Sequence, residues 1–386
     1  MSSPLGNEQR LRKIGSFGWM AAAGGLALTA VGAAVDLQQF YFSYLVAWLY
    51  WLGIALGCFA IGLLHHLTGG GWGGAIRRIV DSGAFLVPIM GLAFLPLVPG
   101  MPTLYPWDRP DLVAHDPILQ HKAPYLNHNF FLARTAGYFV LWTLTGLIVA
   151  WRRRVYAGNL VYDNARRLRV VSGVGLGLYG LSMTFAAIDW AMSLQPHWFS
   201  TIFGVMFVVG QALAALSFAV VVALALRPGD RPTIGERHDL GNLLLAFTML
   251  WAYISFSQFL IIWYANIPEE VTFYQVRFHG GWAWTAVALV LFHFFLPFFA
   301  LLPKTTKRSS QYLIRVAGLI LLMRWVDLVW LIEPVRPREG TFVPWIDLAA
   351  TVGLGGVWLG LFAWRYRTLN VVVLPDDAAK MEHGHG

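Results

Sequence analysis

The sequence predicts an all-α integral membrane protein with about ten transmembrane helices. The 386 residues are 57% hydrophobic and only 12% charged, with a mean hydropathy of +0.58, whereas a soluble domain carries about 25% charged residues. The apolar residues are gathered into repeated stretches of roughly 20 residues, the length that crosses a hydrocarbon layer as a helix. The 18 Trp and 14 Tyr residues suit a protein that anchors aromatic rings at both membrane interfaces.

Ten apolar stretches follow one another along the chain. They cover residues 14–35, 40–64, 79–98, 129–151, 169–191, 199–226, 240–265, 281–302, 312–333 and 343–364. Residues 1–13 form a polar, basic segment before a membrane domain of residues 14–365, and residues 366–386 form a tail. No obvious cleavage site follows the first stretch, so we expect a retained helix and not a signal peptide.

The basic residues fall mainly on one side of this arrangement. Of the 28 Lys and Arg residues, 20 lie at the two termini or in the loops on the same side as the termini. Five lie on the other side and three lie inside the stretches. Because cytoplasmic loops carry an excess of Lys and Arg, both termini are expected to be cytoplasmic, in a bacterial inner membrane. Basic residues placed between spans also argue against nucleic-acid binding.

Three polar segments outside the spans have simple interpretations. The connection 99–127 is too polar to span and longer than a turn, so we expect it to pack on the outer surface or on a partner. The glycine-rich loop 65–74 follows no strand and lacks a P-loop lysine, which favours a flexible turn over phosphate binding. His383 and His385 near the C-terminus are better explained by a disordered end than by a metal site.

The single cysteine, Cys58, excludes a disulfide framework, a cluster ligated by several cysteines and a CxxCH haem attachment. His293 lies at the centre of the eighth stretch, but no other stretch has a central histidine to complete a bis-histidine haem site. We expect His293 to be a hydrogen-bonded packing residue or a member of a proton relay. No catalytic or metal-ligating residue is predicted.

Charged residues inside an apolar layer are costly unless they are paired or hydrated, so each one is a candidate functional residue. Arg324 and Asp327 are three residues apart on one helix face and can pair with each other or with a facing helix. A structural ion pair and a step on a proton or quinol-linked path are both compatible with this spacing. Glu333 lies at the outer end of the same stretch.

Other polar residues are expected to gather in the outer half of the layer. Arg134 lies roughly 9 Å below His128 along its helix, at a depth similar to that of Asp189. The remaining members are Asp347 near the outer surface and Ser255, Ser257 and Gln258 in the seventh stretch. On the cytoplasmic side Asp81 is the main candidate, whereas His65, His66 and Arg315 read as interfacial residues.

Three segments resemble the ActF family of membrane subunits in bacterial alternative complex III, a quinol:cytochrome c oxidoreductase. They are AIDWAMSLQPHWFSTIFGV (187–205), SFSQFLIIWYANIPEE (255–270) and RWVDLVWLIEP (324–334). The resemblance extends over nearly the whole chain and includes the ten-span layout. ActF is similar to ActC and, more distantly, to membrane anchors of the NrfD and PsrC type. The residues that carry the resemblance are Asp189, His197, Ser257, Gln258, Glu269, Arg324, Asp327 and Glu333.

The resemblance implies two four-helix bundles, at about 40–191 and 199–333, with two peripheral helices. It implies a subunit in a respiratory or photosynthetic electron-transport chain that supports assembly and proton translocation. The expected partners are an ActC-like quinol subunit, an iron–sulfur subunit, multihaem cytochrome c subunits and membrane lipids. Haem and iron–sulfur clusters would then belong to partner subunits, with no covalently bound cofactor in this chain and with ActC as the better candidate for the quinol site. Quinone or menaquinone is a ligand of this chain only under the second hypothesis below.

Two functional hypotheses remain open, with a secondary transporter as a weaker third because no midplane substrate cluster is evident. The first is a non-catalytic subunit that takes part in proton movement or in assembly alone. A proton path is compatible with the sequence because burial and a neighbouring arginine act in opposite directions on the pKa of a carboxyl group and can set it near working pH. Its candidate residues are Asp189, Asp327, Arg324, Glu333, Asp81, Ser257, Gln258, His293 and Asp347. The second is a quinone-binding subunit, with His128, Arg134 and Asp189 around the head group.

Overall fold

The computed structural model describes residues 5–158, 160, 162–225, 232–336 and 345–369; His383 and His385 lie outside these residues. Every regular element in the described part of the chain is helical, so the protein is an all-α integral membrane protein, as predicted. The long helices are α1 (Leu5–Val35), α2 (Leu37–Thr68), α8 (His128–Gly158), α9 (Tyr162–Trp190), α10 (Phe203–Ala225), α11 (Ile234–Ala265), α16 (Ser310–Ile332) and α17 (Trp345–Thr368).

Shorter helices complete the bundle and cover its ends. The third predicted span comprises α3 (Gly71–Ala84), α4 (Val87–Leu92), a 3-10 turn (Leu95–Gly100) and α5 (Met101–Leu104). The eighth predicted span comprises α13 (Trp282–Ala288), a π-helical segment (Leu289–Phe295) and α14 (Leu296–Leu301). The connecting helices are α6 (Pro110–His115), α7 (Pro117–Lys122), α12 (Pro268–Arg277) and α15 (Lys304–Arg308), with 3-10 turns at Pro106–Asp108, Met192–Leu194 and Glu333–Val335.

Eight of the described helices are long and apolar enough to cross a membrane, and the bent pair Gly71–Leu92 and Leu95–Leu104 would make a ninth. Helix α16 has 23 residues and lies among these helices, but Arg315, Arg324 and Asp327 make it too charged to qualify by composition. The predicted count of ten therefore requires that both the bent pair and the charged α16 cross the membrane.

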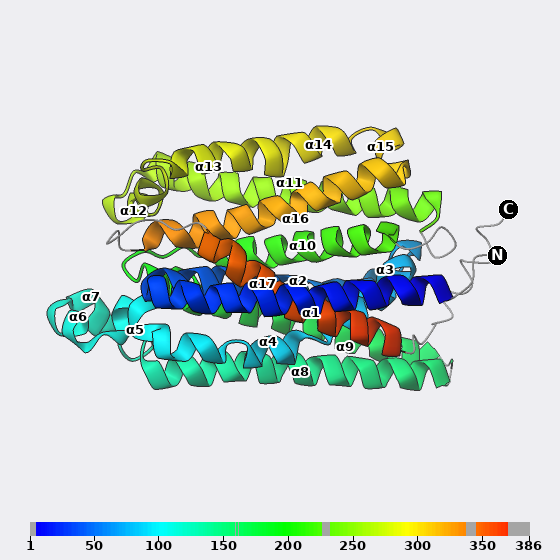
Figure 1. The fold of residues 1–386 in the computed structure, drawn as a ribbon, viewed down its shortest axis with the longest axis horizontal. Helices are drawn as coiled ribbons and strands as arrows, with labels where there is room; N and C mark the ends of the chain where they lie inside the picture. Colours follow the sequence, from blue (N-terminus) through cyan, green and yellow to red (C-terminus); the bar gives the residue numbers. More distant parts are fainter. Residues whose placement is uncertain (1–4, 159, 161, 226–231, 337–344, 370–386) are drawn as a thin grey trace.

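The long helices run side by side along one axis (Figure 1). Helices α2 and α10 pack against each other at the centre; α2 also contacts α3 and α9, and α10 contacts α11 and α16. Helices α1 and α17 form an extensive pair on one flank (Figure 1). The helices α5–α7 and α12 lie at one end, here called the cap end. The other end carries α3, α15 and the C-terminal end of α17, and is here called the basic end.

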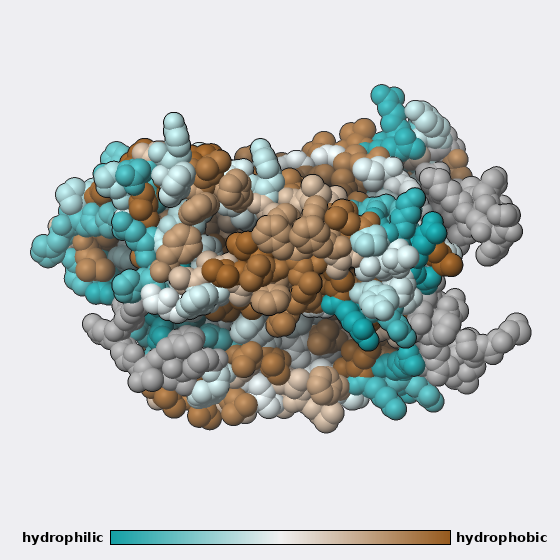
Figure 2. All heavy atoms as spheres, turned by 90° about the horizontal axis from the view of Figure 1, so that it is seen from above, coloured by the Kyte–Doolittle hydropathy of each residue, from teal (hydrophilic) through white to brown (hydrophobic). Residues whose placement is uncertain are grey.

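The surface of the bundle is divided along the same axis. Figure 2 shows hydrophobic residues over the broad middle of one face and hydrophilic residues concentrated toward both ends. Large apolar side chains such as Leu147, Phe256 and Phe299 are about 60% exposed in the middle of the helices. Exposure of this kind is favourable only in a hydrocarbon solvent or against a partner, so the middle band is the membrane-facing surface.

Local sequence signals fix several helix ends. Asp36 caps α2 by accepting a hydrogen bond from the backbone N–H of Gln39 at 2.8 Å. Thr233 and Glu236 form a reciprocal capping box at the start of α11. The same helix ends at Asn266, which has φ 48°, a left-handed conformation that asparagine tolerates better than most residues. These caps satisfy backbone groups that a helix of any sequence would otherwise leave unpaired.

The third span is not a continuous helix. The chain bends by 43° between Gly71–Leu92 and Leu95–Leu104. The run from Pro88 to Pro102 contains four prolines, and each removes a backbone donor and disfavours a helical residue before it. In the eighth span the helix loosens into the π segment just before Pro297. Both irregular segments lie beside cavities.

The contact between α2 and α10 depends on a glycine. A Cβ atom added at Gly57 would lie 2.0 Å from the backbone carbonyl oxygen of Gln211. Because that neighbour is main chain, it cannot move aside without shifting α10. Gly137 on α8, in contrast, has open space where its Cβ would be.

We therefore expect Gly57→Ala to destabilise the protein by about 1–3 kcal/mol through overpacking. The measurement is the thermal unfolding midpoint in detergent, which should fall by several degrees. Gly137→Ala is the matched control, and it should be neutral or slightly stabilising because alanine is the better helix former. Equal midpoints for the two variants would contradict close packing of α2 on α10.

Candidate functional site

The first buried charge pair joins two of the residues predicted for quinone binding. Arg134 on α8 donates from Nε and Nη2 to the two carboxylate oxygens of Asp189 on α9, each at 2.9 Å. Tyr138 donates to the same carboxylate at 2.7 Å. The guanidinium also lies over the ring of Tyr125 at 3.8 Å. Arg134 and Asp189 therefore lie at the same depth, as predicted from helical rise. Both oxygens of the Asp189 carboxylate accept hydrogen bonds.

His128, the third predicted quinone residue, lies one step further out and faces a different partner. Its Nδ1 lies 3.1 Å from a carboxylate oxygen of Asp108 in the cap. Neither of the two larger cavities described below is lined by His128, Arg134 or Asp189. The three residues thus form a bridge between α8, α9 and the cap.

The second buried pair lies within α16. Arg324 donates to Asp327 Oδ2, and both side chains are almost completely buried. Room for the guanidinium is provided by Gly210 on α10, where a Cβ would lie only 2.4 Å from the Arg324 Cζ atom. Trp251 on α11 donates to the same Asp327 oxygen at 3.2 Å. The pairing predicted from the three-residue spacing is therefore present, and a tryptophan is added to it.

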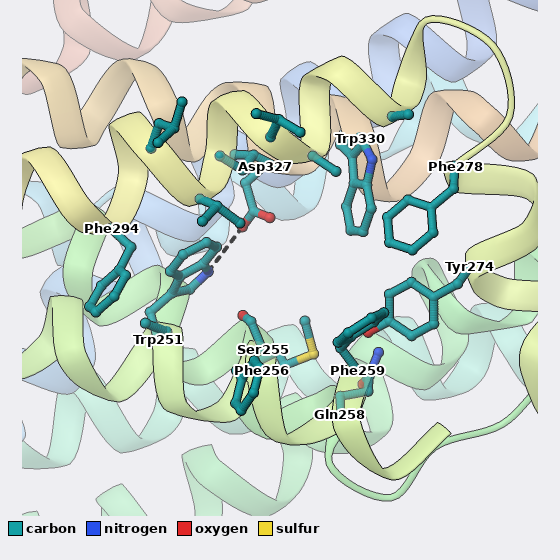
Figure 3. A pocket seen from close by; sticks show the side chains of 18 of the residues that line it. Trp251, Ser255, Phe256, Gln258, Phe259, Tyr274, Phe278, Phe294, Asp327 and Trp330 are labelled. Carbon is teal, nitrogen blue, oxygen red and sulfur yellow. Dashed lines mark hydrogen bonds between the residues drawn. The ribbon is translucent and has the colours of Figure 1, made fainter. Parts of the chain in front are cut away.

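A cavity of about 700 Å³ lies beside this pair, between α11, α12, α13, the π segment and α16 (Figure 3). Its walls are aromatic and aliphatic and include Trp251, Phe259, Phe278 and Trp330. Phe256 and Val290 on its rim are 61% and 50% exposed on the perimeter of the bundle. An opening at the perimeter faces the hydrocarbon, so the cavity is accessible to a lipid-soluble molecule.

A few polar groups interrupt the apolar lining. Gln258 is buried, accepts a hydrogen bond from Ser200 at 3.3 Å, and has no hydrogen-bond partner for its Nε2 group among the described residues. Ser255 Oγ is likewise without one. In Figure 3 one oxygen of Asp327 meets Trp251 and the other points into the cavity. A buried polar group costs free energy unless it is bonded, which favours a polar occupant.

Tyr274 adds a further polar group on the cap side of the cavity, close to Gln258 (Figure 3). Burial raises the pKa of the Tyr274 hydroxyl to about 12. The group is therefore a neutral hydroxyl at physiological pH, able to donate or accept a hydrogen bond.

His293 lies in the π segment, next to the cavity wall. Its ring is completely buried and its centroid lies 4.2 Å from that of Trp251, edge to face. Neither ring nitrogen has a hydrogen-bond partner in the described part of the chain, so the expected hydrogen-bonded packing residue is not observed. A π segment inside an α-helix often marks a functional site, and here it places His293 behind the tryptophan that bonds Asp327.

The remaining predicted residues are distributed over both ends. Asp81 pairs with Arg153 at 2.6 Å at the basic end. At the cap end, Ser43 donates to Asp347 at 2.5 Å and Arg336 lies 3.6 Å from Glu333. His197 lies 2.6 Å from Asp116 of the cap, and Glu269 lies in α12. Ser257 does not line the cavity, although its neighbours Ser255 and Gln258 do.

The structure thus separates the predicted outer-half cluster into two groups, Arg134–Asp189 and Arg324–Asp327. Of these two groups, the second borders the 700 Å³ cavity, through Asp327. Sequence reasoning overlooked Trp251, although its spacing to Ser255 and Gln258 places all three on one face of α11. Trp330 was also overlooked. Single aromatic residues are so common in this chain that neither tryptophan stands out.

Among the described residues, no group of three or more His, Cys, Asp or Glu side chains could hold a metal ion. No protein-family model matches the sequence, and no curated protein is detectably similar to it. The candidate site is therefore defined by its geometry: an aromatic cavity open to the membrane, which ends at an arginine-paired carboxylate.

Proposed function

We propose that this protein is an integral membrane subunit of a quinol-oxidising electron-transport complex, and that it binds quinol in the cavity between α11, α13 and α16. The resemblance to ActF supports the complex, and the cavity supports the ligand. An isoprenoid quinol combines a flat ring, two hydroxyl groups and an apolar tail. That combination suits aromatic walls, a few polar groups and an opening toward the hydrocarbon.

The observation that carries the proposal is the cavity-facing oxygen of Asp327. The other oxygen is occupied by Arg324 and Trp251, which holds the carboxylate in one orientation. A quinol hydroxyl at the deep end of the cavity could donate to the remaining oxygen, while Gln258 Nε2 or Ser255 Oγ could donate to the ring oxygen at the other end. The ring would lie between the aromatic walls.

Oxidation of quinol to quinone releases two protons and two electrons. In the proposed step Asp327 accepts the first proton as the ring loses it, and the second leaves through the polar groups beside Gln258. The two electrons would be taken up by a redox centre of a partner subunit, which this chain does not supply. The geometry required of a general base, a heavy-atom distance within hydrogen-bond reach, is available only to the cavity-facing oxygen.

The proposal is tested by measuring the affinity of the protein for menaquinone-4 in lipid nanodiscs. Binding is monitored by the quenching of tryptophan fluorescence. Ala286→Phe would place a ring inside the cavity and should weaken binding at least tenfold. Ala288→Phe lies on the same helix but does not line the cavity, so it should bind as the wild type does. Because this variant has the same tryptophans as Ala286→Phe, it also measures the quenching caused by free quinone in the lipid.

Gln258→Leu provides a milder variant of nearly the same size. We expect a three- to tenfold loss of menaquinone-4 affinity, the usual worth of one hydrogen bond. Gln211→Leu is the control, because Gln211 is a buried glutamine outside the cavity, bonded to Tyr179 at 2.6 Å. It should reduce thermal stability without changing affinity. Saturable binding that is indifferent to Ala286→Phe and Gln258→Leu would exclude this cavity, and an assembly role alone would then remain.

A further inference from the structure

A second cavity, of about 300 Å³, lies at the basic end between α2, α3, α8 and α17. Its mouth carries Arg153, Arg154 and Arg365, together with Asp81 and His66. The wall away from these charges is apolar and includes Phe59 and Trp142, with Leu147 at its lateral edge. From Trp142 to Arg154 the cavity follows α8 for 12 residues, or roughly 18 Å, about the length of an extended acyl chain.

The charges at the mouth are not balanced within the described residues. Arg153 is paired with Asp81 at 2.6 Å, which uses the one carboxylate that lines the cavity. Arg154 is exposed and shows no ion pair, and Arg365 Nε is buried without a hydrogen-bond partner. The Arg365 guanidinium lies over the ring of Phe85 at 4.6 Å, which holds it at the mouth. Two positive charges therefore remain for a ligand.

We propose that this cavity binds an anionic phospholipid, with its phosphate between Arg154 and Arg365 and one acyl chain along α8 beside Phe59 and Leu147. Basic pockets between transmembrane helices are suited to such head groups. Leu147 is 61% exposed and Phe85 is 36% exposed, so the cavity opens laterally to the membrane and a lipid can enter from its leaflet. The site is separate from the proposed quinol cavity and does not depend on it.

The experiment is native mass spectrometry of the full-length protein, purified with its natural subunits, delipidated, and then titrated with phosphatidylglycerol. Phosphatidylcholine, which carries the same phosphate but no net charge, and inorganic phosphate are the comparison ligands. The wild type should bind phosphatidylglycerol at least tenfold more tightly than phosphatidylcholine. Inorganic phosphate should not displace it, because the acyl chain contributes much of the binding.

Arg154→Gln combined with Arg365→Gln should reduce phosphatidylglycerol affinity roughly 30-fold, because both basic residues at the head group are lost. The control is Arg166→Gln with Arg167→Gln, which removes two arginines at the same end that do not line the cavity. Arg154→Lys combined with Arg365→Lys should retain most of the wild-type affinity.

The apolar half of the site is tested without removing a charge. Gly146 lines the cavity and has space for a Cβ, so Gly146→Phe should fill the acyl-chain path and weaken binding, while Gly137→Phe on the same helix should not. The proposal fails if the paired arginine variant binds phosphatidylglycerol normally, if phosphatidylcholine binds equally well, or if millimolar inorganic phosphate displaces the lipid, which would indicate a small-anion site.

Discussion

Asp327→Asn is expected to reduce quinol oxidation by the assembled complex at least about 100-fold, the lower end of what a general base contributes. Asparagine keeps the shape of the side chain and can still accept the hydrogen bond from Trp251. It cannot take a proton from the quinol hydroxyl. The measurement is steady-state reduction of cytochrome c by a menaquinol analogue, using complex purified through a tag on this subunit.

Quinone affinity should change much less than turnover in this variant. The aromatic walls, Gln258 and Ser255 remain in place, so menaquinone-4 should bind within a few-fold of the wild-type affinity. A parallel loss of binding and turnover would mean that Asp327 shapes the cavity and does not act on the proton. Full turnover in Asp327→Asn would exclude it from the chemistry.

Loss of the carboxylate also leaves Arg324 buried and unpaired, which by itself could prevent folding. The double variant Asp327→Asn with Arg324→Gln removes both charges together and should recover much of the thermal stability. It should remain inactive, because the proton acceptor is still absent. Asp327→Glu keeps a carboxylate at a slightly different position and should retain measurable turnover. These two variants separate the chemical role from the structural one.

The sequence predicts the parts of this site that depend on a single helix. Arg324 and Asp327 meet because a three-residue spacing brings side chains together on any helix. The similar depths of Arg134 and Asp189 follow from helical rise within each helix, but depth alone does not show that the two side chains pair. The capping residues Asp36 and Thr233 mark helix starts for a similarly local reason.

The parts that depend on how helices rotate against each other could not be predicted. Trp251 reaches Asp327 only because α11 turns that face toward α16, and no spacing within either helix specifies this. The cavity requires the π segment, which has no clear sequence signal apart from Pro297 after it. The prolines of the third span indicate an irregular helix, but the sequence does not give the 43° angle of its bend.

Asp189→Leu should lower the free energy of unfolding by about 3–5 kcal/mol, because it leaves the Arg134 guanidinium without its bidentate carboxylate partner. The readout is thermal unfolding of the purified protein in detergent. Arg134→Leu should be similarly damaging, since it leaves a completely buried carboxylate held only by the Tyr138 hydroxyl.

The double variant Arg134→Leu with Asp189→Leu should be more stable than either single variant, because replacing a buried ion pair by apolar residues is often nearly neutral. Each of these three variants that folds should bind menaquinone-4 with wild-type affinity, since this pair lies outside the proposed quinol cavity. Weakened quinone binding without loss of stability would instead support the head-group site at His128, Arg134 and Asp189. If the stability losses of the two single variants simply added up in the double variant, that result would contradict the pairing. The ion pair is therefore interpreted as a brace between α8 and α9, which leaves Asp327 as the buried carboxylate with access to a ligand.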